Sequence, residues 1–99
     1  MGRGERPVIT FEWDPLKAEA NARKHGVTFE EARTCFYDPW QVAFYDPDHS
    51  EDEDRELLIG HSNLGRVLIV SYALRGDLIR IISARKATSA EVNRYAQGI

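Results

Sequence analysis

Arginine is frequent in the second half of the chain, at positions where it could act on a phosphate. Five arginines lie within or beside segments of strand-like pattern, and a lysine follows the last of them: Arg55, Arg66, Arg75, Arg80, Arg85 and Lys86. A guanidinium group binds phosphate oxygens through two parallel hydrogen bonds and stays charged at any working pH. Fixed cations also neutralise the charge that develops on a phosphorane. The pattern therefore predicts a site that binds, and can cleave, a phosphodiester.

We expect this phosphodiester to be that of RNA. Cleavage of RNA also needs groups that transfer protons, because the 2′-hydroxyl loses a proton and the leaving oxygen gains one. His61 and Tyr72 are the candidates nearest to the arginines by strand position. His25 is another if its helix ends near the sheet edge, although a histidine at a helix C-terminus more often stabilises that end. We expect Arg80 and Arg85 to hold the scissile phosphate, and the supporting contacts to be Arg55, Arg66, Arg75 and Lys86.

A structural role is the alternative for each single arginine. An arginine on a solvated sheet face covers apolar neighbours with its aliphatic stem. Arg55 could equally pair with acidic residues of the adjacent segment. The nuclease interpretation therefore depends on several arginines meeting on one uncovered face.

Other chemistries find little support in the sequence. It contains no nucleophile elbow, glycine-rich phosphate loop or nucleotide fingerprint. The three histidines share no helical or strand spacing, and the single Cys35 cannot complete a zinc site with them. We predict no metal and no cofactor, and we interpret Cys35, which lies in an apolar stretch, as a buried and inert thiol.

The distribution of charge is more informative than its total of −3. Residues 45–56 hold seven acids and one arginine, whereas residues 65–99 hold six bases and two acids. The second region is the candidate anion-binding region. The first is typical of a solvated loop, because it lacks the spacing of a calcium-binding loop.

The length of 99 residues predicts one domain, with residues 1–7 flexible. No apolar run approaches the ~20 residues that span a membrane, and the polar N-terminus does not resemble a signal peptide. We therefore expect a cytoplasmic protein without membrane contact.

The hydrophobic period changes once along the chain. Its first part predicts a strand at 8–13, a helix at 15–25 and a second helix that opens at Thr28. The second part predicts four antiparallel strands and a short helix, at 40–45, 55–61, 66–74, 78–85 and from 88 onward. Helices followed by a run of strands indicate an α+β fold, with the helices on one face of the sheet and the other face partly open.

The register of the last hairpin has two alternatives. A three-residue loop at 75–77 places Tyr72 opposite Arg80, whereas a shift of one residue places Ser83 and Arg85 on the face of Tyr72. Either register predicts that a tyrosine and at least one arginine share a face.

Several stretches, in matching order over residues 9–95, resemble the BrnT toxin family. They are Phe11–Pro15 with Lys17 and Asn21, Lys24–Ala32, Arg55 with Ile59–Gly60, Gly65–Leu68 with Val70 and Tyr72, Arg75, Arg80–Arg85, and Ala87, Glu91 and Tyr95. The resemblance implies a RelE-like ribonuclease fold and an RNA-cleaving activity that arrests growth. It also implies a BrnA-type antitoxin as partner, with operator DNA bound only through the antitoxin complex.

Two features depart from that pattern: the acidic segment makes the whole chain anionic, and His61 stands where we expect arginine, lysine or another polar residue. The alternative function is therefore a binding module without catalysis, which acts only in an antitoxin-containing repressor complex. Direct DNA binding is disfavoured because no predicted helix carries a run of bases suited to a major groove.

Overall fold

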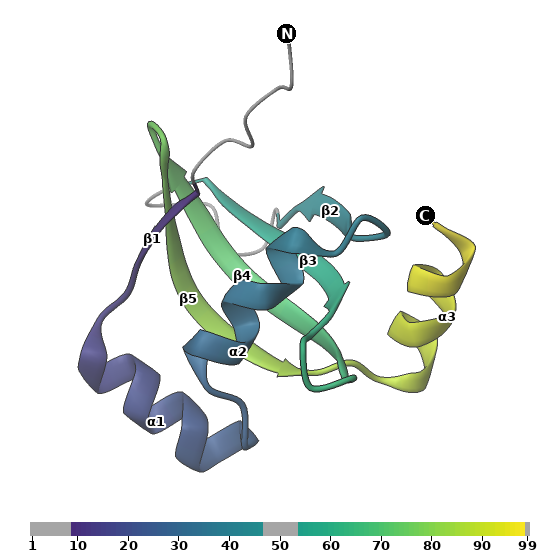
Figure 1. The fold of residues 1–99 in the computed structure, drawn as a ribbon, viewed down its shortest axis with the longest axis horizontal. Coiled ribbons are helices and arrows are strands. Elements are labelled where there is room, and N and C mark those ends of the chain that lie inside the picture. Colours follow the sequence, from purple (N-terminus) through teal and green to yellow (C-terminus); the bar gives the residue numbers. More distant parts are fainter. Residues whose placement is uncertain (1–8, 47–53, 99) are drawn as a thin grey trace, which may run out of the picture.

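The computed structural model describes residues 9–46 and 54–98, which form one sheet and three α-helices (Figure 1). The elements are β1 (Thr10–Glu12), α1 (Pro15–His25), α2 (Phe29–Thr34), the 3-10 helix η1 (Cys35–Tyr37), β2 (Val42–Tyr45), β3 (Arg55–His61), β4 (Val67–Arg75), β5 (Leu78–Lys86) and α3 (Ser89–Gln97). This order confirms the predicted α+β class. The expected flexible residues 1–7 and most of the acidic segment, 47–53, lie outside the described residues.

The sheet has the strand order β1-β5-β4-β3-β2. Strands β2 to β5 pair with their neighbours in antiparallel fashion, as the sequence predicts. The prediction of a four-stranded meander is nevertheless incomplete, because β1 joins the sheet beside β5 in parallel. The result is a mixed sheet of five strands.

The predicted capping residues lie at the ends of the helices. The carboxylate of Asp14 accepts a hydrogen bond from the Leu16 N–H at 2.9 Å, and Gly26 ends α1 with a φ of 68°. Thr28 caps α2, and Thr88 forms a complete capping box with Glu91 at the start of α3. These local signals fix where α1 ends, and therefore where His25 lies.

The main core lies between the sheet and the segment of α2 and η1, while α1 lies beside β5 (Figure 1). Phe29 and Ala32 of α2 and Cys35 of η1 are fully buried against strand residues such as Leu58 and Val70. Burial raises the pKa of the Cys35 thiol to about 12, so the prediction of a buried thiol is confirmed. No described helix is long and apolar enough to cross a membrane.

A bulge in β5 decides which side chains occupy the sheet face that α2 and η1 leave uncovered, where Arg85 meets Glu91 of α3. The β4–β5 loop has two residues rather than three, and Gly76 adopts the positive φ of 62° that the first central position of a tight hairpin requires. The register then shifts between Ser71 and Tyr72, so that Ile82 is the extra residue. In a regular strand Arg80 and Arg85, five positions apart, would face opposite sides. The bulge places both on the uncovered face.

A buried asparagine joins α1 to the outer edge of β5. The Asn21 side chain is 7% exposed, and its amide donates to the carbonyls of Val27 and Ala84, each at 2.9 Å. Its oxygen accepts from the Ala84 N–H at 3.1 Å. Since β1 pairs only with residues 78–80 of β5, Asn21 satisfies edge groups that no neighbouring strand reaches.

We expect Asn21→Ala to lower the free energy of unfolding by about 3 kcal/mol, because it leaves three buried backbone groups without this partner. Urea denaturation of the variant against the exposed control Asn93→Ala measures the effect. A loss below about 1 kcal/mol would contradict this role.

Candidate active site

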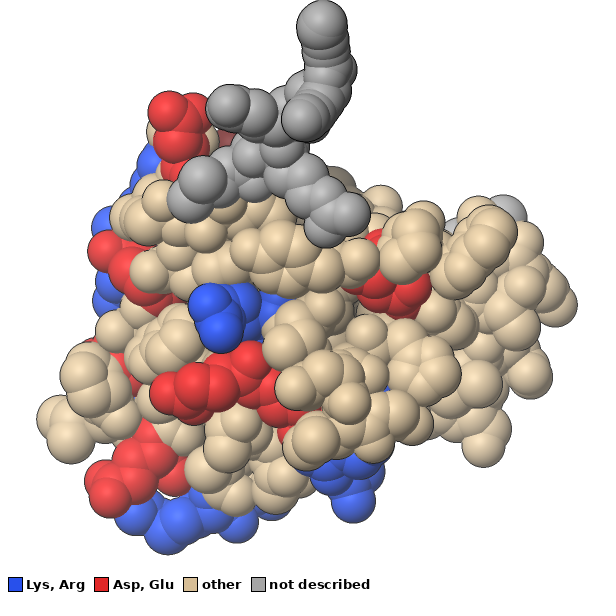
Figure 2. All heavy atoms as spheres, in the orientation of Figure 1, with Lys and Arg blue, Asp and Glu red and all other residues tan. Residues whose placement is uncertain are grey.

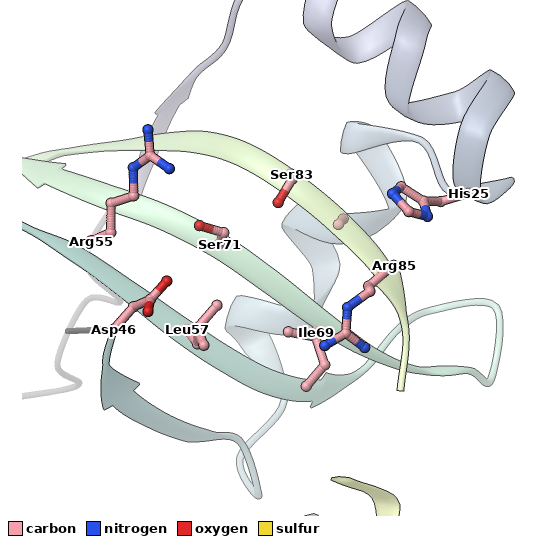
Figure 3. A pocket seen from close by; sticks show the side chains of 9 residues that line it. His25, Asp46, Arg55, Leu57, Ile69, Ser71, Ser83 and Arg85 are labelled. Carbon is pink, nitrogen blue, oxygen red and sulfur yellow. The ribbon is translucent and has the colours of Figure 1, made fainter. Parts of the chain in front are cut away.

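The uncovered face of the sheet contains a cavity of about 430 Å³ (Figure 3). Its volume lies within the range of small-molecule sites. The residues that line it come from the end of α1, the position after β2, and strands β3, β4 and β5: His25, Asp46, Arg55, Leu57, Ile69, Ser71, Ser83, Ala84 and Arg85. The cavity therefore combines two guanidinium groups, one imidazole, one carboxylate and two hydroxyls above an apolar floor.

Strand pairing explains why the arginines share this cavity. Arg55 opens β3 opposite Ala73 of β4, and Arg85 lies near the end of β5 opposite Ile69. Between them, Ser71 and Ser83 form a cross-strand pair at the bulge. Figure 3 shows Arg55 and Arg85 toward the two ends of the cavity, with the serines between them.

His25 enters the cavity from the last turn of α1. Gly26 stops the helix there, and Asn21, one turn earlier, fastens α1 to Ala84. In Figure 3 the imidazole lies beside the outer edge of β5, on the side of Arg85. The helix end is thus near the sheet edge, the condition under which the sequence makes His25 a candidate.

Arg85 is held by a carboxylate of α3. Its two terminal nitrogens donate to the two Glu91 oxygens at 2.8 and 2.9 Å, and one of them also donates to the Lys86 carbonyl. The bidentate pair fixes the plane of the guanidinium, while 42% of the Arg85 side chain remains exposed. The hydrogen bonds from Arg85 lower the pKa of Glu91 to about 2, against the opposing effect of burial.

This pair makes stability depend on pH. The pKa of Glu91 is lower in the folded chain than its ordinary 4.5, so its contribution is present above about pH 4.5 and is lost as the pH falls toward 2. We expect Glu91→Gln, which preserves the capping box, to lower the free energy of unfolding by about 1 kcal/mol at pH 7. Denaturation curves should show this difference disappearing near pH 2, whereas Glu30→Gln, at an exposed site, should show no comparable trend.

Two predicted arginine contacts are engaged elsewhere. Arg80 forms an ion pair with Glu12 of β1 at 3.1 Å and does not line the cavity. Arg66 is bonded to the buried Glu31 and to the Gly26 carbonyl on the helix side of the sheet, where its hydrogen bonds lower the pKa of Glu31. The structure therefore does not bring all the predicted arginines together.

The other two predicted contacts also lie outside the cavity. Arg75 is exposed beside the hairpin turn, at the end of β4. Lys86 follows Arg85 and therefore points to the other face of the sheet. Its register partner on β4 is Leu68. The expectation of a broad cluster is replaced by a smaller one built on Arg55 and Arg85.

The expectation that Tyr72 shares a face with the arginines is wrong. Tyr72 is 5% exposed in the helix-covered core, its ring contacts Phe36, and its hydroxyl donates to Glu56 at 3.0 Å. Burial raises the pKa of Tyr72, and the Glu56 carboxylate adds to this effect. Neither predicted register applies, because the two-residue loop and the bulge together place Tyr72 opposite Ile81.

His61 belongs to a separate network beside α3. The His61 ring meets that of Tyr95 edge-on at 6.4 Å, and the backbone N–H of His61 donates to the Asp38 carboxylate at 2.8 Å. The Tyr95 hydroxyl donates to the same carboxylate at 2.6 Å. These bonds attach α3, which has no buried residue, to the end of β3.

Sequence reasoning missed Ser71, Ser83 and Asp46 as cavity residues. The signal that could identify the serines is weak, because two serines in apolar strands become neighbours only once the bulge fixes the register. Asp46 follows β2, and its backbone N–H donates to the Arg55 carbonyl at 2.9 Å. This bond places Asp46 beside the first residue of β3. In the sequence it cannot be distinguished from the acids that follow it.

The fold and the cavity define a small α+β protein with an arginine- and histidine-lined pocket on an open sheet face. Residues 13–91 match the model of the family described as ribonuclease toxin, BrnT, of type II toxin–antitoxin systems. The chain therefore belongs to the BrnT family, and the resemblance inferred from the sequence is confirmed.

A solved structure supports the same fold. The crystal structure of the Brucella abortus ribonuclease toxin BrnT aligns with a TM-score of 0.61 and 24% sequence identity, over 83% of this chain and 100% of that chain. Among curated proteins, none matches the chain.

Proposed function

We propose that this BrnT-family chain is a metal-independent endoribonuclease of the RelE-like class, and that the open-face cavity is its active site. One observation carries the proposal: Arg55 and Arg85, from separate strands, line a single cavity with His25. Two cations and a group that can transfer protons are components that RNA cleavage uses.

In the proposed reaction the ribose 2′-oxygen attacks the adjacent phosphorus and the bond from phosphorus to the 5′-oxygen breaks. The products are a 2′,3′-cyclic phosphate and a free 5′-hydroxyl. Arg55 and Arg85 bind the non-bridging oxygens, whose negative charge increases in the transition state. His25 carries one of the two proton transfers, and we assign the other to Asp46, which lines the same cavity.

The ion pair between Arg85 and Glu91 is compatible with this role. Glu91 occupies one edge of the guanidinium, and the group retains further N–H donors for a phosphate. An arginine whose plane is already fixed loses less conformational entropy when the substrate binds. We therefore assign to Glu91 the positioning of Arg85.

The family assignment extends the proposal to partners. Type II toxins are paired with antitoxins, and we propose a BrnA-type antitoxin for this chain, with operator DNA bound only through their complex. Part of the helix-covered side toward α3 carries few charged side chains (Figure 2). Three large apolar side chains are exposed on this side: Tyr37 in η1, Trp40 just before β2, and Val92 in α3. Protein partners commonly bury side chains of this kind.

A binding module without catalysis is the second candidate. The pairing of Arg80 with Glu12 and of Arg85 with Glu91 favours it, because each pair reduces the positive field on the open face. Such a chain would retain the fold and the antitoxin interface and would not cut RNA.

Incubation of the purified protein with RNA in excess EDTA distinguishes the two functions. We expect cleavage that survives chelation, stops when the antitoxin is added and leaves 2′,3′-cyclic phosphate ends. A lack of cleavage at every protein concentration would favour the binding module. Cleavage that EDTA abolishes would refute the metal-independent mechanism.

A further inference from the structure

We propose that the face of α1 beside β5 binds the RNA nucleotides that flank the scissile phosphate, and that Lys17 and Lys24 bind their phosphates. This inference rests on the proposed function, because the RNA strand would enter this site from the active-site cavity. It accounts for Lys17, Asn21 and Lys24, which the sequence analysis singled out and to which the proposed reaction gives no role.

A second cavity, of about 310 Å³, lies between α1 and β5. It is lined by Lys17, Ala20, Asn21, Lys24, His25, Ile82 and Ser83. His25 and Ser83 also line the active-site cavity, so the two hollows meet at these residues. A strand whose phosphate lies between Arg55 and Arg85 would therefore continue over the outer edge of β5 and onto α1.

Helical spacing places the two lysines on one stripe. Lys17, Asn21 and Lys24 lie at positions i, i+4 and i+7 of α1, and the lysines are about 10 Å apart along the helix axis. Asn21, between them, is bonded to the backbone of Ala84 and so holds this stripe against β5. The two cations therefore have a fixed relation to the active site.

The charge of this second cavity suits a polyanion. No Asp or Glu lines it, and neither lysine has an ion pair or side-chain hydrogen bond within the part of the chain that the structure describes. Arg66, Arg80 and Arg85, in contrast, are each paired with a carboxylate. Figure 2 shows basic side chains along the lower edge of the molecule, over α1.

The floor of the cavity distinguishes a nucleotide from a simple anion. Ile82, the extra residue of the bulge, and Ala20 provide apolar surface between the lysines. A sugar or base can rest on such surface while the adjacent phosphates reach the ammonium groups. A free phosphate or an acidic peptide would make no comparable use of it.

A non-cleavable RNA tests the inference without requiring activity. The probe is a single-stranded octanucleotide with 2′-O-methyl groups throughout, which lacks the attacking hydroxyl. We expect Lys17→Ala/Lys24→Ala to bind it about 20-fold more weakly at 0.1 M salt, and to reduce the slope of log affinity against log salt by about 1.4. The control Arg23→Ala/Arg33→Ala removes the same charge at exposed positions that line neither cavity.

Probe length provides the second arm. A dinucleotide has one phosphodiester and fills only the active-site cavity, so we expect the lysine variant to bind it with the affinity of the wild-type protein. Equal octanucleotide affinities for the two double variants would overturn the inference. The lysines would then be assigned to the binding of an acidic protein partner. If the wild-type protein cleaves no RNA but the lysine-specific loss is observed, the proposed catalysis fails and the binding site stands.

Discussion

Replacement of Arg85 by alanine is expected to slow RNA cleavage about 100- to 1,000-fold, the usual cost of removing one preorganised donor to a transition-state oxygen. Arg85 lines the cavity and its guanidinium plane is fixed by Glu91, so it can oppose the phosphorane charge without reorganisation. Single-turnover cleavage of a short RNA measures the effect. Arg85→Lys should recover little activity, because an ammonium group keeps the charge and loses the planar fork.

Two other arginines provide the controls for this prediction. Arg23→Ala, in an exposed pair with Glu19, should cleave at the wild-type rate. Arg80→Ala should lose less than about 10-fold, because Arg80 is paired with Glu12 outside the cavity. Loss of activity in Arg80→Ala with retention in Arg85→Ala would favour the sequence-based expectation for Arg80 and contradict the site described above.

Local rules explain why the elements were predictable. Asp14 before Pro15, Gly26, and the Thr28 and Thr88 caps are short-range signals whose energetics involve only neighbouring residues. The switch from a helical to an alternating hydrophobic period is equally local. The parallel pairing of β1 with β5, in contrast, joins residues nearly 70 positions apart, and no local pattern encodes it.

The candidate site was only partly predictable, and the bulge is the reason. A register shift of one residue moves every side chain of a strand to the other face of the sheet. The sequence does not show that Ile82 is inserted as the extra residue of a bulge. The sequence therefore leaves open which face Arg85 occupies, and its expectation that Tyr72 shares a face with an arginine is wrong. The partners of Arg66, Arg80 and Arg85 likewise come from distant glutamates, whose proximity only the fold establishes.

His25 illustrates how a residue with an ordinary local role acquires another through tertiary structure. Its place in the last turn of α1 is sufficient to explain it as a stabiliser of the helix end. The cavity adds a second explanation, because Asn21 binds the helix to Ala84 and brings the imidazole over the edge of β5 toward Arg85. The two roles predict different consequences of substitution.

If His25 transfers a proton in the reaction, His25→Ala should lower the cleavage rate about 100- to 10,000-fold. The affinity for the non-cleavable 2′-O-methyl octanucleotide should change less than about 3-fold. Free imidazole added to the variant should restore part of the rate, because it can occupy the vacated space and carry the proton. Cleavage rates with and without imidazole measure the loss and its recovery, and a titration with the octanucleotide measures the affinity.

The comparison with His61 makes the test specific. His61 was the histidine favoured by strand position, but its ring lies against Tyr95 and outside the cavity. His61→Ala should therefore cleave at the wild-type rate and should not respond to imidazole. If His25 served only as a helix stabiliser, its alanine variant would unfold more readily. At temperatures where it remains folded, it would cleave at the wild-type rate and would not respond to imidazole. Such behaviour would leave Arg55 and Arg85 as phosphate ligands and transfer the proton-moving role to another group.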